Sequence, residues 1–406
     1  MSLSQAQEAT GRYVPGMAAI DAVRVDMLAP DWWVDLDRVH DFFRRARHEE
    51  PVYREANGYW VVTRHADVID VERRSQVFSS RGAYRVNLAP DESNTIALDD
   101  PEHLEQRRLV SRRFTPRAVQ EHDDFLRTRI GELLDAVADQ GRLEVVHDLA
   151  AQLPSRFTAA LLGFDEDRWE DVKSWSERLM RTDAIMFDND ALMGVIDAIQ
   201  EFNPVLQALS GERKGCPADD LITVWTEAGL EPLTMMHETG LFIAGGAETT
   251  RTVIARGLAV LASHPEQWEA AAADPSLLPG LVEEVIRWVT PLNNMFRQVL
   301  ADDRIGDQPV QAGDRVMLAY PSANRDEAVF DDPFRFDIRR NPNPHLAFGQ
   351  GTHFCVGANL ARLELRLLFA ELTRRWTDLA VITPPDLEPN IFATAVRHFD
   401  LAFTPR

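Results

Sequence analysis

The sequence predicts a mainly α-helical protein with a smaller β-rich part. The chain has 406 residues, of which 45% are hydrophobic, so it can bury a large core. Successive amphipathic segments fill its middle, and short alternating apolar runs near both ends indicate strands. We expect a single domain over residues 1–406, with the β-rich part mainly at 51–63, 292–320 and 379–403.

The charge balance is strongly acidic. Asp and Glu number 65 against 43 Lys and Arg, and this net charge of −22 disfavours nucleic acid as a partner. The two cysteines, Cys216 and Cys355, lie far apart, so we expect neither a disulfide nor a Cys-x-x-Cys zinc site. The chain shows no signal peptide, and no run reaches the ~18 apolar residues of a membrane span. These features predict a cytoplasmic protein.

Turn residues and apolar periods divide the first 100 residues. Asn57-Gly58 lies between two alternating apolar runs, which predicts a β-hairpin. A long stretch without periodicity is typical of a functional loop. The expected segments are an irregular stretch at 1–35, a helix at 36–50, the hairpin at 52–62, a second helix at 66–74 and the loop at 75–100.

Helices dominate the remainder. In the first of them His103 and Arg107 are four residues apart and share a face. The region 117–207 reads as several helices, with breaks near Gly141, Pro154, Gly163 and Asp188, before a surface linker at 210–220 that holds Cys216. Further helices are expected at 103–114, 232–263, 277–289 and 358–376, and further strands at 295–300, 315–320 and within 379–403.

The longest predicted helix spans 232–263, and the residues at its centre are poor helix formers. Its middle, Ala244–Thr250, holds two glycines, each costing about 1 kcal/mol relative to alanine in a helix. Glu248 is a charged residue within a largely apolar segment. Residues that weaken a helix are therefore concentrated in this segment, which is typical of a functional site.

A glycine-rich loop precedes the last helix and holds Cys355. Gly349, Gly351 and Gly357 allow the backbone to turn tightly and approach a flat ligand. A thiolate at the start of a helix lies near the positive end of the helix dipole. These residues alone are compatible with a haem ligand, with a cysteine nucleophile that uses His353 as its base, and with a structural thiol.

Three motifs together resemble the cytochrome P450 family over nearly the whole chain. They are Phe348-x-x-Gly351-x-His353-x-Cys355-x-Gly357, Glu284-x-x-Arg287 and Gly245-Gly246-Ala247-Glu248-Thr249. Residues 287–297 and 320–326 further resemble actinobacterial enzymes that hydroxylate the terminal methyl of the cholesterol or cholestenone side chain.

The resemblance implies a cytochrome P450 fold and a haem b cofactor. Cys355 is the expected thiolate ligand of the haem iron, and a thiolate favours O–O cleavage. His103, Arg107, Arg297 and His353 fall where the family contacts the haem carboxylates, which require cationic or hydrogen-bonding partners. Further expected cofactor contacts are Ala244, Gly245, Phe348, Gly349 and Gly357.

Roles for other residues follow from the same resemblance. Glu248 and Thr249 form an expected catalytic acid–alcohol pair that delivers protons for oxygen activation. A threonine that merely bonds back to a helical carbonyl is the alternative, and the two are compatible. Glu284, Arg287 and Arg335 are expected to form a structural ion-pair triad behind the cysteine loop.

The predicted reaction is hydroxylation of an apolar lipid, with O₂ and two electrons from a ferredoxin and its reductase. Arg108, Arg112 and Arg113 form either the ferredoxin docking patch or a solvated helix face. The alternatives are a fatty-acid hydroxylase or peroxygenase, a haem-thiolate sensor or carrier, and a cysteine hydrolase. Peroxygenases lack the acid–alcohol pair that this chain has. Candidate substrate contacts are Ile185, Met186, Asn293, Asn294 and Met295, and the two asparagines have no assigned role.

Overall fold

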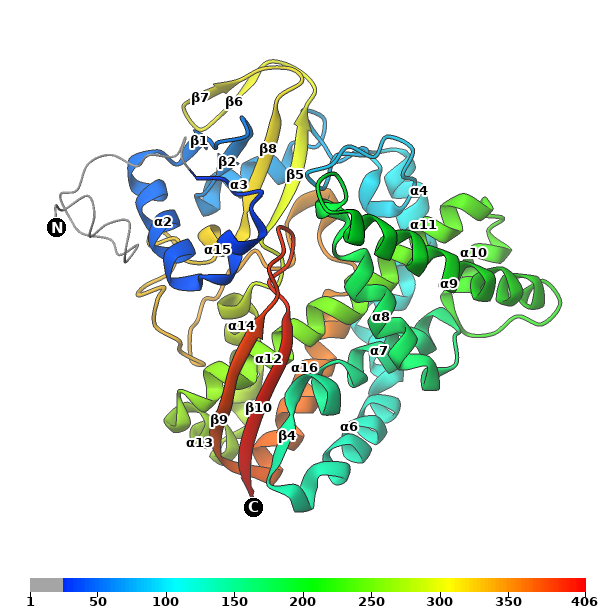
Figure 1. Ribbon diagram of the computed structural model, residues 1–406, viewed down its shortest axis with the longest axis vertical. Coiled ribbons are helices and arrows are strands. Elements are labelled where there is room, and N and C mark those ends of the chain that lie inside the picture. Colours follow the sequence, from blue (N-terminus) through cyan, green and yellow to red (C-terminus); the bar gives the residue numbers. More distant parts are fainter. Residues whose placement is uncertain (1–24) are drawn as a thin grey trace.

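The computed structural model describes residues 25–406, and these residues form a mainly helical body with smaller sheets (Figure 1). The predicted fold class is therefore confirmed. Most of the expectation of an irregular start, residues 1–24, lies outside the described residues. Within the described part of the chain, no helix is both long enough and apolar enough to cross a membrane.

The main sheet joins two distant parts of the chain. Its strand order is β1-β2-β8-β5-β3, and β2 pairs in parallel with β8, which places Trp60 beside Val316. The predicted hairpin is present, with Gly58 at a φ of 86° in its turn. The strands are β1 Val52–Arg54, β2 Trp60–Val62, β3 Phe78–Ser79, β5 Asn294–Val299 and β8 Arg315–Ala319.

Two helices and a short helical turn pack beside this sheet. They are α2 Leu36–Glu49, α3 His65–Arg73 and α15 Tyr320–Ala323. Aromatic and branched side chains from these helices and the sheet form two apolar clusters, one around Phe43 and Phe296 and one around Val68 and Leu318. The sheet is therefore held on a rigid base, and α3 and β5 both reach the site described below.

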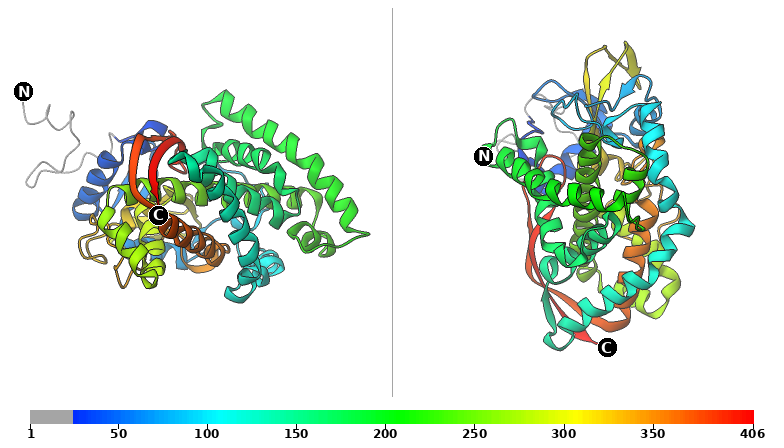
Figure 2. Two further views of the ribbon diagram at one scale, coloured as in Figure 1. Left: turned by 90° about the horizontal axis from the view of Figure 1, so that it is seen from below. Right: turned by 90° about the vertical axis from the view of Figure 1, so that its right-hand side faces the viewer.

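The other strands lie outside this sheet. A second sheet has the order β4-β10-β9, and its two long strands run side by side along the molecule (Figures 1 and 2). The sequence did not predict β4 or the hairpin β6–β7, because three-residue strands are too short to show a period. The bounds are β4 Arg142–Glu144, β6 Asp303–Ile305, β7 Gln308–Val310, β9 Trp376–Leu387 and β10 Val396–Pro405.

The helical body surrounds the main apolar core. The break predicted near Pro154 lies at Ala151, between a π-helical turn at Val146–Ala150 and α7, and Pro154 itself lies in the first turn of α7, where its missing N–H has no helical partner. One predicted boundary is wrong. The helix α9 continues to Arg213 through Pro204, so the linker begins later than expected. The helices are α4 Glu102–Ser111, α5 Pro116–Val119, α6 Asp123–Val137, α7 Gln152–Leu162, α8 Trp169–Leu179, α9 Asn189–Arg213, α10 Leu221–Glu227, α13 Pro265–Ala273, α14 Leu278–Val289 and α16 Ala358–Arg375.

The longest helix crosses the molecule and is interrupted at its centre. It consists of α11 Pro232–Ile243, a single π-helical turn at Ala244–Glu248, and α12 Thr249–Ala262. Such turns are frequent at functional sites, because the extra residue per turn shifts the hydrogen-bonding of the backbone. The two glycines that weaken the helix in this segment therefore lie within the π-helical turn that interrupts it.

Candidate active site

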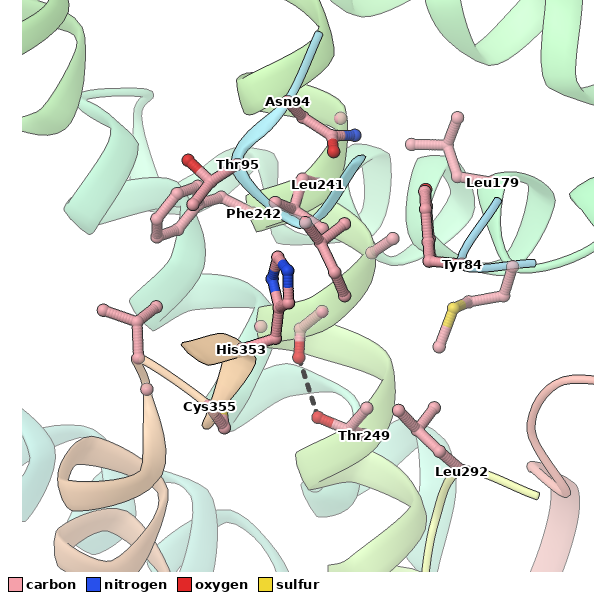
Figure 3. A pocket seen from close by; sticks show the side chains of 18 of the residues that line it. Tyr84, Asn94, Thr95, Leu179, Leu241, Phe242, Thr249, Leu292, His353 and Cys355 are labelled. Atoms are coloured by element: carbon pink, nitrogen blue, oxygen red, sulfur yellow. Dashed lines mark hydrogen bonds between the residues drawn. The ribbon is translucent and has the colours of Figure 1, made fainter. Parts of the chain in front are cut away.

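A cavity of about 780 Å³ lies between the long helix and the loop that carries Cys355. In Figure 3, Thr249, Leu241 and Phe242 project from the long helix, and His353 and Cys355 from the loop opposite. Most side chains of the wall are apolar, and the volume is within the range of small-molecule sites. The predicted cofactor residues Ala244, Gly245, Phe348, Gly349 and Gly357 all line it.

The loop backbone presents Cys355 to this cavity. The Cys355 N–H donates to the carbonyl of Phe348 at 2.9 Å, and Gly349 and Gly351 both adopt a φ of 67°. A Cβ at Gly351 would lie 2.6 Å from the carbonyl oxygen of Glu72, so only glycine fits. The accessible surface of Cys355 faces the cavity within the protein.

Opposing influences act on the Cys355 thiol. Enclosure by the protein raises its pKa, while the backbone N–H groups of Gly357 and Ala358 and the charges of Arg107 and Arg362 lower it. The N–H groups belong to the start of α16, where unpaired amide donors favour a negative charge. The sulfur is thus arranged to carry a negative charge once a cation lies beside it.

Cationic and unsatisfied polar groups gather around the same part of the cavity. Arg107, Arg297 and His353 line it, and the rings of His103 and His353 are 4.4 Å apart. The Nε2 atoms of both histidines are buried and have no hydrogen-bond partner among residues 25–406. Burial, together with Arg297, His103 and Arg107, lowers the pKa of His353 to about 2, so its ring is neutral.

These groups fit haem. Buried donors without partners and two guanidinium groups match a ligand with two carboxylates, while the apolar walls match its flat ring. Cys355 supplies a sulfur at the same cavity. His353, by contrast, makes no hydrogen bond to Cys355 in the described part of the chain, which argues against a cysteine hydrolase that uses this ring as its base.

The acid–alcohol pair is divided between the cavity and the protein interior. Thr249 lines the cavity, and its hydroxyl donates to the carbonyl of Gly245 at 2.7 Å, across the π-helical turn (Figure 3). The alternative interpretation of this threonine, a hydroxyl bonded back to a helical carbonyl, is therefore seen in the structure. Glu248 is 2% exposed and is not among the described residues that line the cavity, because it is turned toward Arg251.

A chain of charged side chains connects Glu248 with the outside. Arg251 bonds both Glu248 and Glu177, and Lys173 lies 2.7 Å from Glu177. Burial raises the pKa of Glu248 to about 7, although Arg251 opposes the rise. Glu248 is therefore able to exchange a proton near neutral pH, which is the property expected of a proton carrier.

Comparison with known proteins decides the family. A family model described as Cytochrome P450 matches residues 268–392. A steroid C26-monooxygenase of Mycolicibacterium smegmatis is 37% identical over 370 residues, which cover 89% of this chain and 92% of that protein. The chain belongs to the cytochrome P450 family. This P450 is also 30% identical over 406 residues to linalool 8-monooxygenase of Pseudomonas putida, with 94% and 100% of the two chains covered.

Solved structures support the same assignment. A Mycobacterium marinum cytochrome P450 in complex with pseudoionone has a TM-score of 0.87 and 30% identity, covering 96% of this chain and all of that chain. A Bacillus megaterium cytochrome P450 in complex with testosterone has a TM-score of 0.84 and 26% identity, covering 91% of this chain and 98% of that chain. The protein is thus a P450 monooxygenase with the cytochrome P450 fold, and membership of this family implies a haem cofactor.

The ion-pair triad of this P450 differs from its prediction in one member. Arg287 bonds both carboxylate oxygens of Glu284, at 2.7 and 2.8 Å, as expected. The third member is Arg340, whose Nε lies 3.2 Å from Glu284. The prediction of Arg335 is wrong, because its side chain points outward to Asp337 and only its carbonyl reaches the triad.

The predicted substrate contacts divide in a similar way. Met295 lines the cavity, whereas Ile185 and the 75% exposed Met186 are not among its described wall residues. Asn293 and Asn294 are buried, and their amides donate to the carbonyls of Asn390 and Ile391. The asparagines therefore fix the segment that leads to Phe392 in the cavity wall, and the expectation that they contact substrate is wrong in this structure.

Sequence reasoning missed several polar residues of the cavity. Arg85 pairs with Asp183 at 2.8 Å and lies 3.9 Å from the ring centre of Phe392. Glu364 on α16 lines the wall, and burial raises its pKa to about 8. The one available signal was an acidic residue between Leu363 and Leu365, whereas Arg85 lies in a loop without a period.

The basic cluster lies on α4 and just beyond it. Arg107 faces the cavity and donates to the carbonyl oxygens of Thr352 and Phe354, which ties α4 to the Cys355 loop. Arg108 and Arg112 are exposed, and Arg113 pairs with Asp219. Two exposed cationic side chains, Arg108 on α4 and Arg112 directly after its last residue, thus lie on the segment that Arg107 ties to the cysteine loop.

Proposed function

We propose that this P450 hydroxylates the terminal methyl of a steroid side chain, such as that of cholesterol or cholest-4-en-3-one. The observation that carries the proposal is the large, mainly apolar cavity between Cys355 and Thr249. Its wall near the long helix includes Ala244 and Phe392 from a small apolar cluster, which suits a hydrocarbon chain. Relatives named steroid C26-monooxygenases support the substrate class.

The proposal includes haem b as the cofactor. When bound, a haem thiolate supplies the O₂ chemistry that oxidises an unactivated C–H bond. Cys355 would ligate the iron, and Arg107, Arg297, His103 and His353 would hold the carboxylates. The apolar wall would exclude water, which strengthens the interactions of polar groups that remain inside.

Thr249 and Glu248 would handle protons in this scheme. The Thr249 hydroxyl already holds a hydrogen bond at the cavity wall, and Glu248, the residue directly before it, has a pKa near neutrality. Glu248 would take up protons through the chain of Arg251, Glu177 and Lys173, and would release them toward Thr249. A hydroxyl and a carboxyl so placed contribute positioned proton transfer.

Electrons would come from a ferredoxin and its reductase in the cytoplasm. An acidic ferredoxin would dock on the α4 side, where Arg108 and Arg112 are exposed next to the loop of Cys355. The remainder of the molecule is strongly acidic, so an acidic ferredoxin would be attracted to this side and repelled by the other surfaces.

A fatty-acid hydroxylase is the second candidate, and Arg85 is the observation that favours it. A guanidinium in an apolar cavity can bind a carboxylate. However, Asp183 already pairs with Arg85, so a free fatty acid would have to displace that carboxylate. This arrangement favours a neutral lipid. A peroxygenase is disfavoured by the presence of Thr249.

Spectroscopy and substrate titration test the proposal. The reduced, carbon-monoxide-treated protein should show the strongly red-shifted Soret band of thiolate-ligated haem, and its absence would reject the haem assignment. Titration with cholest-4-en-3-one should then shift the Soret band at lower concentrations than a medium-chain fatty acid does, and turnover should yield the terminally hydroxylated sterol. Tighter binding and exclusive oxidation of the fatty acid would instead support the second candidate.

A further inference from the structure

Glu72, in the last turn of α3, places a carboxyl group of the protein at the site proposed for the haem carboxylates. Glu72 is 4% exposed and lines the cavity. Its Oε1 accepts a hydrogen bond from the Tyr320 hydroxyl at 2.6 Å and lies 3.8 Å from a terminal nitrogen of Arg297. Its Oε2 is buried and has no hydrogen-bond partner within residues 25–406.

The groups that face Glu72 come from three parts of the fold. β5 contributes Arg297, α15 contributes Tyr320, and the Cys355 loop contributes the backbone N–H of Gln350. β6 also packs on α3, but its Asp303 is paired with Arg74. Arg297 is thus the single cation facing Glu72 from the described residues, and it is 3% exposed.

Arg297 is also a guanidinium assigned above to a haem carboxylate. Its other contact is a hydrogen bond to the carbonyl of Phe296 at 2.7 Å, so it has donors left for a further acceptor. Two carboxyl groups that meet at one buried cation cannot both ionise without a large cost, and such pairs commonly share one proton.

We propose that Glu72 is a haem-positioning residue that keeps a proton and donates it in a hydrogen bond from Oε2 to the haem carboxylate held by Arg297. This inference rests on the haem part of the proposed function. It explains why one oxygen of a buried carboxyl group is left without a partner at the cavity wall.

The electrostatics of the site agree with this assignment. Burial raises the pKa of Glu72 to about 7, while Arg297, Tyr320 and the N–H of Gln350 oppose the rise. A second carboxylate nearby would raise it further. Glu72 would therefore be protonated at and below neutral pH, and it would lose its proton, and then repel the haem carboxylate, as the pH rises above this range.

The test compares haem retention by three haem-loaded proteins. Glu72→Gln keeps a hydrogen-bond donor of similar shape but cannot ionise. Glu238→Gln is the matched control, because Glu238 is another buried carboxyl with a raised pKa, yet it bonds Thr95 and Gln106 rather than Arg297. The rate of haem transfer to excess apomyoglobin is measured across neutral and mildly alkaline pH, with circular dichroism as a check on folding.

The expected result is a severalfold rise in haem release with pH in the wild-type protein and in Glu238→Gln, and a slow, pH-independent release in Glu72→Gln. Equal pH profiles for wild type and Glu72→Gln would overturn the proposal. If Glu72→Gln does not fold, the wild-type profile decides, because pH-independent haem release alone would overturn it. A protein without the thiolate-haem spectrum would instead refute the proposed function.

Discussion

At the scale of single residues, Thr249 occupies a position that serves both structure and chemistry. Its hydroxyl donates to the carbonyl of Gly245 across the π-helical turn, and both residues line the cavity. A side chain that can exchange this bond for one to a cavity ligand needs no movement of the backbone. Structural and catalytic interpretations of this residue therefore do not exclude one another.

Replacing Thr249 with alanine should separate electron consumption from product formation. Thr249→Ala should retain haem and sterol binding, since the lost group is one hydroxyl at the cavity wall. It should nevertheless divert most NAD(P)H electrons to hydrogen peroxide, which is measured as the ratio of product to NAD(P)H consumed. A Thr249→Ser variant should restore most of the coupling, and full coupling in Thr249→Ala would refute the proton role.

Glu248 should make turnover depend on pH. Its pKa of about 7 means that the side chain carries a proton below neutrality and loses it above. Turnover should therefore fall as the pH rises through this range, if proton donation by Glu248 limits the rate. Glu248→Gln should lower the turnover rate by about 10²-fold and should abolish this dependence of turnover on pH. Stopped-flow and steady-state rates across the range provide the measurement, and a wild-type pH profile in Glu248→Gln would contradict the assignment.

At the scale of elements, the segment before the cysteine loop is fixed by Glu284. This carboxylate accepts bonds from Arg287, Arg340 and Asn343, and it also accepts from the backbone N–H of Asp337. One buried anion on α14 thus determines the path of an irregular segment. The glycines of the loop and their close approach to α3 complete the support of Cys355.

A pair of arginine variants should distinguish the true third member of the triad from its neighbour. Arg340→Ala should destabilise the protein by about 2–4 kcal/mol, because it removes a buried partner of Glu284. Arg335→Ala should leave stability nearly unchanged, because that side chain is largely exposed. Denaturant unfolding of the haem-loaded proteins measures both, and equal losses would contradict this arrangement.

The elements also show what sequence reasoning can and cannot reach. The long helix and its weak centre were predictable, since periodicity and two glycines are local signals. Arg340 was not distinguishable from Arg335, because both lie in an irregular segment where spacing does not determine direction. Glu72 was missed for a different reason: it is distant in sequence from Arg297, and their contact depends on how the whole fold brings α3 and β5 together. Short strands such as β4 carry no periodic signal at all.

At the scale of the whole molecule, charge is unevenly distributed relative to the site. The chain has a net charge of −22, yet Arg108 on α4 and Arg112 directly after it are exposed, and Arg107 ties this helix to the Cys355 loop. Long-range attraction of an acidic partner depends on ionic strength, whereas contacts within the cavity do not. Docking and catalysis are therefore separable by experiment.

Charge reversal at Arg108 and Arg112 should slow reduction by a ferredoxin without changing sterol binding. The double variant Arg108→Glu and Arg112→Glu should lower the second-order rate about tenfold or more at low salt, with the difference shrinking as salt increases. Stopped-flow reduction provides the rate, and Arg168→Glu, directly before α8, serves as a surface control. Unchanged reduction rates at low salt would assign the cluster to a solvated helix face.

The wall of the cavity extends along the sequence from Glu72 to Phe392, and this has a consequence for biosynthesis. A growing chain emerges with the contacts from α3 and α4 long before the ribosome reaches Cys355. The haem proposed above would therefore have no complete binding site until translation is almost finished, so its insertion would belong to the last stage of synthesis or follow it.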